Sequence, residues 1–362
     1  MKNNKKNYGT QNRYFALLFS FIIAILLLLT LYGCRSETSK SEDLMYEINS
    51  DGKTCTVIGC NEMLFNEIVI PDSYNGYTVT GIADYAFQNQ KMSSVTLPST
   101  IEHIGQGAFA DCTFLKSIYG LENCLYIQSI ENKTFYGCNK LKKIKLPPNL
   151  VSIGDSAFLA CQSLISIELP NSLETISQRA FAGCTSLLSI KFPDDLKYIG
   201  GVAFAQCHAL KEVCLPPNLS SSQIAGPFVC CNALNNIYVS DNSQSLASVD
   251  GVLFDKNIYT LYAYPSGRIS KTYAIPSGVS AIYNMAFAYN VYLTEINIPN
   301  SIDFIYPYVL ENSPNLTTIN YEGTIKEWQL IYKYSNWDTD SADYTIYCTD
   351  GQIAKNGTVT YK

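Results

Sequence analysis

The sequence predicts a β-rich solenoid, an elongated stack of short coils rather than a compact globule. The first reason is a repeat: three consecutive copies, CNKLKKIKLPPNLVSIGDSAFLA, CQSLISIELPNSLETISQRAFAG and CTSLLSIKFPDDLKYIGGVAFAQ, begin at Cys138, Cys161 and Cys184, and a fourth begins at Cys207. A fixed period of about 23 residues is typical of stacked repeats. The second reason is that no single copy carries enough apolar surface to bury its own face, so stacking must create the core.

Each copy contains one predicted strand and one apolar corner. In the copy that begins at Cys161, the spacing L-x-x-I-x-L is formed by Leu164, Ile167 and Leu169, and its alternation of period two predicts a strand. Pro170 ends the strand because proline has no N–H to donate to a ladder. A return segment follows, and an Ala-Phe pair closes the coil. We expect that phenylalanine to be buried, contributing about 1.5–3 kcal/mol per coil. It recurs at Phe87, Phe109, Phe135, Phe158, Phe181, Phe204 and Phe287.

The repeat resembles a known family. L-x-x-I-x-L is typical of leucine-rich repeats, and the proline after the strand followed by I-G-x-x-A-F-x-x-C resembles the BspA-type leucine-rich-repeat proteins of bacterial surfaces. The resemblance covers about residues 64–347. It implies a leucine-rich-repeat array of about 23-residue coils, with a strand row on one face, short irregular return segments and a cap at each end. It also implies a surface protein that adheres to host matrix proteins or to other bacteria.

Two steps in the array depart from the period. The step from Leu115 to Leu141 is 26 residues, so three residues are inserted within 121–128. The step from Leu234 to Leu293 is 59 residues, and Asp250-Gly251 within it predicts a hairpin turn in an irregular coil at about 240–270. The predicted organisation is a signal peptide (1–33), a lipidated tether (34–43), an N-terminal cap hairpin (44–63), leucine-rich repeats (64–320) and a C-terminal cap (321–362).

The N-terminus predicts export. Its first 13 residues carry Lys2, Lys5, Lys6 and Arg13 and no acid, and residues 14–31 are uncharged. The stretch ends in Leu-Tyr-Gly-Cys, which resembles a bacterial lipoprotein signal with Cys34 as the lipidated residue. The alternatives are an uncleaved transmembrane helix, since 18 apolar residues are just long enough to span a bilayer, and soluble secretion. We therefore expect an extracytoplasmic protein whose partner is a membrane through a lipid anchor.

The cysteines predict a ladder of thiols rather than a disulfide framework. Six of the 13 occupy one repeat position, where stacked coils would place them about 4.8 Å apart as small buried hydrophobic residues. Their parallel Cα–Cβ directions are poor disulfide geometry. The predicted ladder is Cys112, Cys138, Cys161, Cys184, Cys207 and Cys230, and the one candidate bridge outside it joins Cys55 and Cys60.

The sequence shows no catalytic or cofactor motif. The only histidines are His103 and His208, and Cys207-His208 is not expected to act as a dyad because the ladder buries the thiol. No zinc spacing or glycine-rich phosphate loop is visible, so no metal and no cofactor are expected. A net charge of −6, with 15% charged residues, argues against a nucleic-acid partner. The two tryptophans, Trp328 and Trp337, belong to a terminal cap or to a sugar-binding platform.

The candidate binding residues are the outward neighbours of the strand isoleucines. They present a plain solvated sheet face or a ligand surface of the kind that solenoids provide. The predicted function is a non-catalytic surface lipoprotein that binds a protein or a glycan, in adhesion. The alternatives are an envelope-organising structural lipoprotein, or a glycan-acting enzyme using Glu168 and Glu212. The candidate ligand-binding residues are Lys143, Lys145, Glu168, Lys191, Glu212 and Tyr238.

Overall fold

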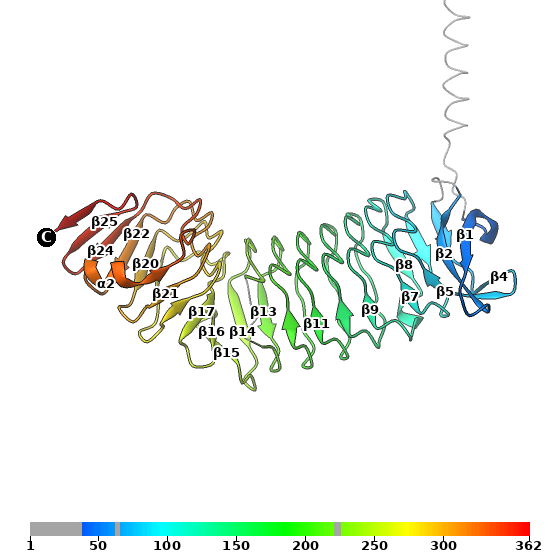
Figure 1. Cartoon of the computed structure of the whole chain (residues 1–362), viewed down its shortest axis with the longest axis horizontal. Coiled ribbons are helices and arrows are strands. Elements are labelled where there is room, and N and C mark those ends of the chain that lie inside the picture. The colour runs from blue at the N-terminus through cyan, green and yellow to red at the C-terminus, as the bar shows by residue number, and fades with distance from the viewer. Residues whose placement is uncertain (1–37, 62–65, 221–225) are drawn as a thin grey trace, which may run out of the picture.

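The predicted β-solenoid is confirmed. A computed structural model describes residues 38–61, 66–220 and 226–362, which form an elongated arch of stacked coils with the C-terminus at one end (Figure 1). Within these residues no helix is both long and apolar enough to cross a bilayer. The predicted export signal and its lipidation site, Cys34, lie outside the described residues.

The L-x-x-I-x-L segments form a row of parallel strands, which we call the leucine row. The strands pair in register from coil to coil, so that Val95 faces Ile118 and Ile296 faces Ile319. Between β8 and β13 the row continues through an isolated bridge from Lys145 to Glu168. Its strands are β3 (Glu67–Val69), β6 (Ser94–Thr96), β8 (Ser117–Tyr119), β13 (Glu212–Leu215), β14 (Asn236–Val239), β18 (Thr272–Ala274), β20 (Glu295–Ile298), β22 (Thr318–Tyr321) and β24 (Thr345–Cys348).

The return segments are more regular than the sequence predicts. They carry a second parallel ladder, the return row, in which Ile153 pairs with Ile130 on one side and Ile176 on the other. Each of these isoleucines is buried, while the residue before it is partly exposed, which is the period of a strand. The row comprises β5 (Tyr77–Ile82), β7 (His103–Ile104), β9 (Ser129–Ile130), β10 (Ser152–Ile153), β11 (Thr175–Ile176), β12 (Tyr198–Ile199), β17 (Thr260–Ala263), β19 (Ala281–Ile282), β21 (Phe304–Ile305) and β23 (Tyr332–Lys333).

The Ala-Phe corner closes each coil. Its phenylalanine is flanked, two residues before and two after, by residues with left-handed backbone, as at Ser156 (φ 56°) and Ala160 (φ 61°) around Phe158. These turns aim the rings inward, where consecutive rings stack with centroids 5.2–5.6 Å apart. The predicted burial of all seven phenylalanines is confirmed, and the stack also contains Phe228.

The thiol ladder is present with one correction. Each thiol donates to the phenylalanine carbonyl of the preceding coil, as Cys184 does to Phe158 O at 3.3 Å. The assignment of Cys230 to the ladder is wrong: Cys231 is the fully buried residue and donates to Phe204 O at 3.1 Å. The step from the preceding ladder thiol is 24 residues, and Cys230 instead takes the left-handed position after the phenylalanine (φ 60°).

The predicted bridge between Cys55 and Cys60 is also wrong. Both residues lie on one extended strand, β2 (Thr54–Cys60). Five residues of strand span about 16 Å, whereas a disulfide needs Cα atoms within about 7 Å of each other. Strand geometry therefore keeps these two cysteines apart.

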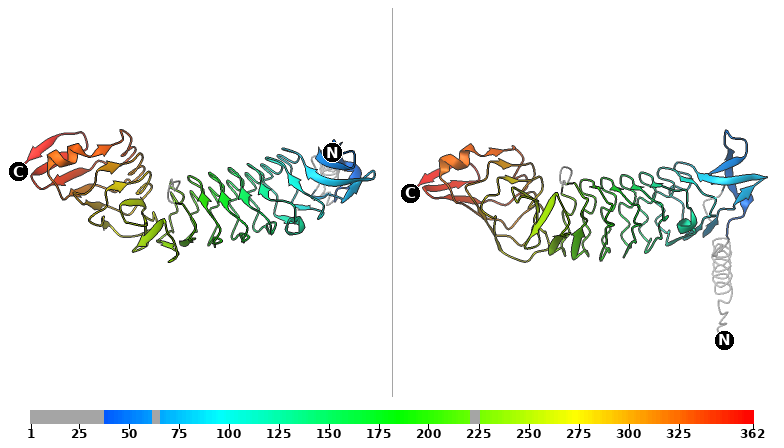
Figure 2. Two further views of the ribbon diagram at one scale, coloured as in Figure 1. Left: turned by 60° about the horizontal axis from the view of Figure 1, so that its bottom comes forward. Right: turned by 90° about the horizontal axis from the view of Figure 1, so that it is seen from below.

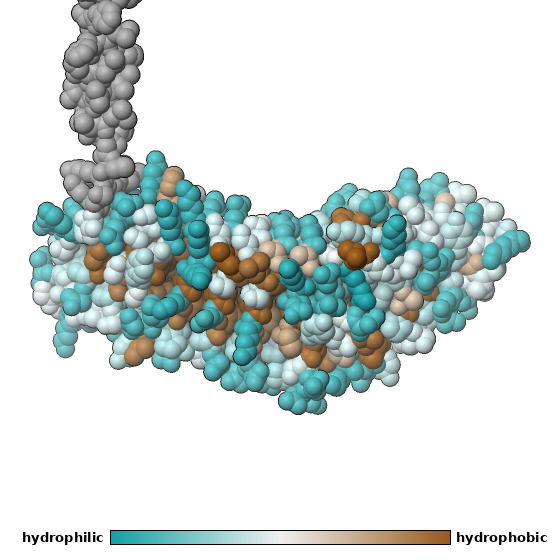
Figure 3. Space-filling view, turned by 180° about the vertical axis from the view of Figure 1, so that it is seen from behind, coloured by the Kyte–Doolittle hydropathy of each residue, from teal (hydrophilic) through white to brown (hydrophobic). Residues whose placement is uncertain are grey.

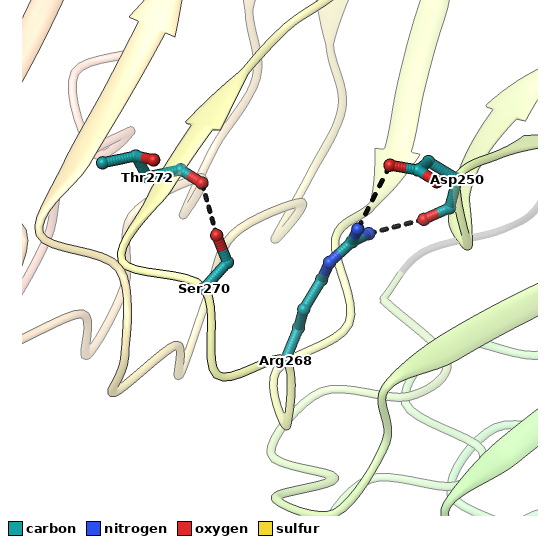
Figure 4. Close-up of polar contacts among 4 residues, drawn as sticks. All are labelled: Asp250, Arg268, Ser270 and Thr272. Carbon is teal, nitrogen blue, oxygen red and sulfur yellow. Dashed lines mark hydrogen bonds and ion pairs between the residues drawn. The ribbon is translucent and has the colours of Figure 1, made fainter.

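Both rows are interrupted where the arch bends. β13 and β14 form a sheet of their own, and the hairpin β15 (Leu246–Val249) and β16 (Val252–Asp255) leads into β17. The bend lies in this yellow-green region, as Figure 1 and the left view of Figure 2 show. Figure 4 shows Arg268, in the loop after β17, reaching Asp250 at the tip of the hairpin, and 3.3 Å separates its guanidinium from the carboxylate. This contact ties the hairpin to the coil after it.

The bend divides the buried apolar residues into two clusters, one running from Leu44 to Ala263 and the other from Val252 to Ile353. We call the coils from β3 to β14 the N-terminal array and those from β17 to β24 the C-terminal array. The second contains a coil that the sequence does not reveal, because Ser270 stands 23 residues before Leu293 at the position of the repeat leucine.

The ends and the insertion are covered by short local elements. At the N-terminus β1 (Leu44–Ile48) pairs antiparallel with β2, after the 3-10 turn η1 (Ser41–Asp43), and β4 (Ser73–Tyr74) pairs with β5. The three extra residues after Leu115 form η2 (Leu121–Asn123). At the C-terminus, helix α2 (Ile325–Leu330) and the strands β25 (Gly351–Ala354) and β26 (Val359–Tyr361) close the stack. Trp328 and Trp337 are both buried there, which suits a cap and leaves neither ring free as a platform.

Candidate binding surfaces

The structure places all six predicted ligand-binding residues on the outward side of the leucine row. Each is exposed, and each lies next to a buried isoleucine or valine of its own coil. They are distributed over five consecutive coils, so about 20 Å of the array separates the first from the last. The residues so placed are Lys143, Lys145, Glu168, Lys191, Glu212 and Tyr238.

Few of these side chains are held by partners within the described residues. Lys145 forms an ion pair with Glu122 at 3.6 Å, with 79% and 34% of the two side chains exposed. Exposed pairs of this kind contribute about 0–1 kcal/mol, so the contact does little to fix Lys145. The outward face of the row is therefore available to a ligand.

A hollow of about 590 Å³ lies at one end of these residues. Four of its lining side chains are Lys116, Lys140, Lys142 and Lys143, and no acidic residue lines it. We call it the lysine hollow; its remaining lining residues are Ser117, Ser163 and Ile165. The lysines come from two neighbouring coils, and a backbone hydrogen bond from Ile165 N to Lys142 O at 3.1 Å holds the following coil against them.

Sequence reasoning found only one of the four hollow lysines. Strand alternation predicts that the two neighbours of the strand isoleucine are exposed, and Lys143 is one of them. The residue directly after the repeat leucine is exposed as well. That position holds Lys116, Lys142, Ile165 and Leu188 in successive coils. The run Asn-Lys-Leu-Lys-Lys-Ile-Lys at 139–145 was the available signal, since lysine-rich segments of this length are typical of polyanion-binding patches.

The position after the leucine changes character along the array. Ile165 and Leu188 are 37% and 54% exposed, whereas the equivalent positions before them carry lysine. Viewed from behind, the molecule shows a hydrophobic patch in the middle of the array beside hydrophilic side chains (Figure 3). An aliphatic surface therefore continues from the lysine hollow along the stack.

A second hollow, of about 410 Å³, lies at the corner turns where the two arrays meet. One wall is made by small residues of the N-terminal array, including Ala182 and Ala205, and the other by Met285, Tyr289 and Glu311. We call it the junction groove. Several of its lining residues, among them Ala160, Val202 and Met285, occupy the left-handed positions that flank the phenylalanines. No pattern in the sequence indicates this groove, because it exists only where the two arrays face each other.

The polar end of the junction groove is electrostatically distinct. Burial, and secondarily the charge of Asp340, raises the pKa of the Glu311 carboxyl. Burial and then the charge of Glu311 raise the pKa of Tyr289, whose backbone N–H donates to Glu311 O at 2.7 Å. An apolar hollow of this size with a few convergent polar groups has the character of a small-ligand site.

The alternatives based on catalysis receive little from the geometry. Burial raises the pKa of Cys207 to about 12, and its thiol donates to Phe181 O, so it does not form a thiolate beside His208. Glu168 and Glu212 are both exposed and lie two coils apart. The residues that the structure describes contain no cluster of His, Cys, Asp or Glu suited to a metal ion.

Comparison with known proteins identifies the family. The chain belongs to the BspA type leucine rich repeat region family, whose model matches in six copies over residues 59–129, 128–257 and 260–336. The resemblance inferred from the repeat is thus confirmed. No curated protein matches the chain.

Solved structures share the fold. A leucine rich cell surface protein from Faecalibacterium prausnitzii is 26% identical, with a TM-score of 0.56, over 78% of this chain and 75% of that protein. A leucine-rich repeat protein from Bacteroides ovatus is 26% identical, with a TM-score of 0.59, over 77% and 70%. The pneumococcal vaccine antigen PcpA matches at 23% identity and a TM-score of 0.55, over 80% and 82%, which is a likeness of fold alone.

Proposed function

We propose that this chain is a non-catalytic binding protein displayed on the cell surface, which contacts a protein or glycan through the outward side of the leucine row. The single observation that carries the proposal is the row itself. Six candidate polar and aromatic side chains are exposed on one face of rigid, consecutive coils, and few of them are engaged by neighbours. Extended rows of this kind are how solenoid proteins bind ligands.

Surface display is supported by the sequence and by the relatives. The N-terminus carries a basic segment, an uncharged segment and Cys34 in a lipoprotein-like setting. The similar protein from Faecalibacterium prausnitzii is described as a cell surface protein. In this proposal Cys34 anchors the chain through acyl chains, each buried CH₂ of which contributes about 0.8 kcal/mol, and the array adheres to matrix proteins or to other cells.

The test is binding of the chain from residue 35 onward to arrays of host matrix proteins and bacterial glycans. One variant carries Glu at Lys143, Lys145 and Lys191. A matched control carries Glu at Lys133, Lys256 and Lys326, which are exposed but lie outside the leucine row, so the net charge changes equally.

The expected result is saturable binding that the row variant loses by tenfold or more and the control retains. Equal loss in both variants would reduce the interaction to net charge, and unchanged binding in both would move the site off the leucine row. Absence of binding to every array component would refute adhesion. It would favour the envelope-organising alternative, to be pursued by crosslinking to partners in the native membrane.

A further inference from the structure

We propose that the lysine hollow binds a sulfated polysaccharide chain. The inference rests on the proposed function, since it names the ligand class for one part of the leucine row. It adds Lys116, Lys140 and Lys142 to the candidate Lys143, so that the site becomes a defined concavity instead of a line of exposed side chains.

The charge of the hollow is opposite to that of the protein. The whole chain has 25 basic and 31 acidic residues, yet four lysines and no acid line this one concavity. Glu122 forms an ion pair with Lys145, which does not line the hollow. Lysine side chains from neighbouring coils line this one concavity. Two ammonium groups about 5–10 Å apart repel each other by about 0.4–0.8 kcal/mol in water. An anionic ligand replaces that repulsion with attraction.

The lysines are arranged for a chain of charges rather than for one ion. Lys116 belongs to the coil of β8, while Lys142 and Lys143 belong to the next coil. One coil before β8, exposed Lys91 occupies the position equivalent to Lys140. Three consecutive coils therefore present positive charge along the axis of the array, which fits a ligand that repeats its negative charge along its length.

The chemistry of the groups favours sulfate esters on a sugar chain. Lysine is a flexible point charge with no fixed fork, and the hollow contains no guanidinium for planar, bidentate recognition. Ser117 and Ser163 add hydroxyls that can exchange hydrogen bonds with sugar hydroxyls, and the exposed aliphatic side chain of Ile165 gives a sugar ring an apolar surface to cover.

A nucleic acid fits less well. Binding of single strands commonly uses aromatic side chains on which bases stack, and no aromatic ring lines the hollow. The nearest aromatic cation contact is that of Lys140, whose ammonium lies 4.3 Å from the centroid of Phe114, so that ring face is already occupied.

The experiment measures heparin binding by titration calorimetry, using the chain from residue 35 onward, at 50 and 200 mM NaCl. Desulfated heparin, polyphosphate and single-stranded DNA serve as the other probes. One variant carries Glu at Lys116, Lys142 and Lys143, and a second carries the neutral Gln at the same three positions. The control is the variant with Glu at Lys133, Lys256 and Lys326.

We expect heparin affinity to fall about tenfold or more between the two salt concentrations, because surface charges are screened over about 10 Å. The glutamate variant should lose at least tenfold in affinity and most of the salt dependence, the glutamine variant an intermediate amount, and the control less than threefold. Circular dichroism should be unchanged in all three, since every substituted side chain is exposed.

Three results would overturn the proposal: equal binding of desulfated heparin, equal affinity in the hollow and control variants, or tighter binding of polyphosphate or DNA than of heparin. Its failure is separable from that of the proposed function. If the matrix arrays bind through Lys145 and Lys191 while heparin does not bind, only the polysaccharide assignment fails. If neither class binds, both fail.

Discussion

The N-terminal and C-terminal arrays build the same coil with different corner residues. In the first, a stacked phenylalanine recurs in each coil, and a buried thiol stands three residues after each ring except Phe87, where Gln90 holds that position. In the second, Phe287 is followed one coil later by Leu310, and the thiol position holds Asn290 and then Ser313. Ser313 Oγ donates to Phe287 O at 2.9 Å, which is the hydrogen bond that the thiols make. The corner therefore requires a small donor that reaches the previous coil, and sulfur is one of several solutions.

Asn290 shows what happens when that donor is larger. Its Oδ1 accepts from Tyr292 N and Leu293 N within its own coil, while its buried Nδ2 has no hydrogen-bond partner among the described residues. A buried donor left without a partner costs about 1–3 kcal/mol. The ladder of coil-to-coil bonds is thus continuous in the N-terminal array and interrupted in the C-terminal array.

The return rows differ in a related way. The N-terminal array places glycine after the buried isoleucine at Gly105 and Gly200, where an added Cβ would lie 2.5 Å from a backbone nitrogen of the previous coil. The C-terminal array places tyrosine there, and the rings of Tyr283 and Tyr306 lie 4.8 Å apart. At these two coils of the N-terminal array a side chain would therefore meet the backbone of the previous coil.

The largest expected effect is a selective loss of stability in alkali. Burial raises the pKa of Cys112 and Cys207 to about 12 and lifts those of the other ladder thiols well above their usual value. A thiol whose folded pKa exceeds its unfolded value stabilises fully below about pH 9 and loses that contribution as the pH rises towards 12. Above about pH 9, each ladder thiol lowers the free energy of unfolding by about 1.4 kcal/mol per pH unit, so the N-terminal array should lose several kcal/mol of stability by pH 10.

The C-terminal array should respond less, because Cys348 is its one buried cysteine among the described residues. Burial also lowers the pKa of Lys333 to about 8. Between pH 8 and 10.5 this lysine is therefore neutral in the folded state and protonated in the unfolded state, so its contribution to the free energy of unfolding rises with pH. Urea unfolding at pH 8 and pH 10 tests this, with Trp328 and Trp337 fluorescence reporting on the C-terminal end and circular dichroism on the whole chain. A tryptophan midpoint that fell as far as the circular dichroism midpoint would contradict the difference. Replacing Cys184 and Cys207 by Ala should reduce the alkaline loss by about a third.

The next effect in size concerns the phenylalanine stack. Phe158→Ala should destabilise the N-terminal array by about 3–5 kcal/mol, because the ring is fully buried between Phe135 and Phe181. The urea midpoint from circular dichroism should fall, while the tryptophan midpoint stays within error if the arrays unfold separately.

Two further variants test whether the two arrays unfold separately. Leu310→Ala should reverse the pattern, lowering the tryptophan midpoint by an equivalent of about 2–5 kcal/mol. Phe304→Ala, at a ring 48% exposed on β21, should change neither midpoint by more than about 1 kcal/mol. Coincident midpoints in all three variants would show that the bend does not divide the cooperative unit.

The sequence predicts the regular parts of this molecule well, because each coil repeats the same solution. Leu164, Ile167 and Phe181 can be assigned to the core from one copy, since stacking must bury them. The return ladder was missed because a strand of two residues has too little alternation to be seen. The coil of β18 was missed because Ser270 replaces the leucine on which the pattern depends.

The sites were less predictable than the fold. The exposure of Lys143 follows from strand alternation, but its neighbourhood with Lys116 depends on how the insertion at η2 sets one coil against the next. The junction groove is lined by corners far apart in sequence, such as those of Ala205 and Met285. Cys230 was misassigned for a different reason. One additional residue in this coil moves the ladder position from Cys230 to Cys231.

The smallest expected effect concerns the left-handed corner positions. In the N-terminal array glycine occupies several of these positions, among them Gly183 (φ 73°), whereas Met285, Tyr289 and other non-glycine residues fill them in the C-terminal array. An added Cβ at Gly183 would lie 3.4 Å from Ala160 Cα, an ordinary contact, so the cost of Gly183→Ala is that of the backbone conformation alone. A left-handed non-glycine residue costs about 1–2 kcal/mol, offset by about 0.5–1 kcal/mol of glycine entropy. Gly183→Ala should therefore destabilise by about 1 kcal/mol.

The reverse change in the adjacent coil is a matched control. Ala160 occupies the same corner position at φ 61°, so Ala160→Gly should stabilise by a similar or smaller amount. Both are measured as circular dichroism midpoints in urea, with the tryptophan midpoint as internal reference. Opposite signs are expected because the two variants exchange the same backbone strain in opposite directions. If both variants destabilised, the corner would be limited by packing against the junction groove, and the strain argument would fail for the non-glycine residues of both arrays.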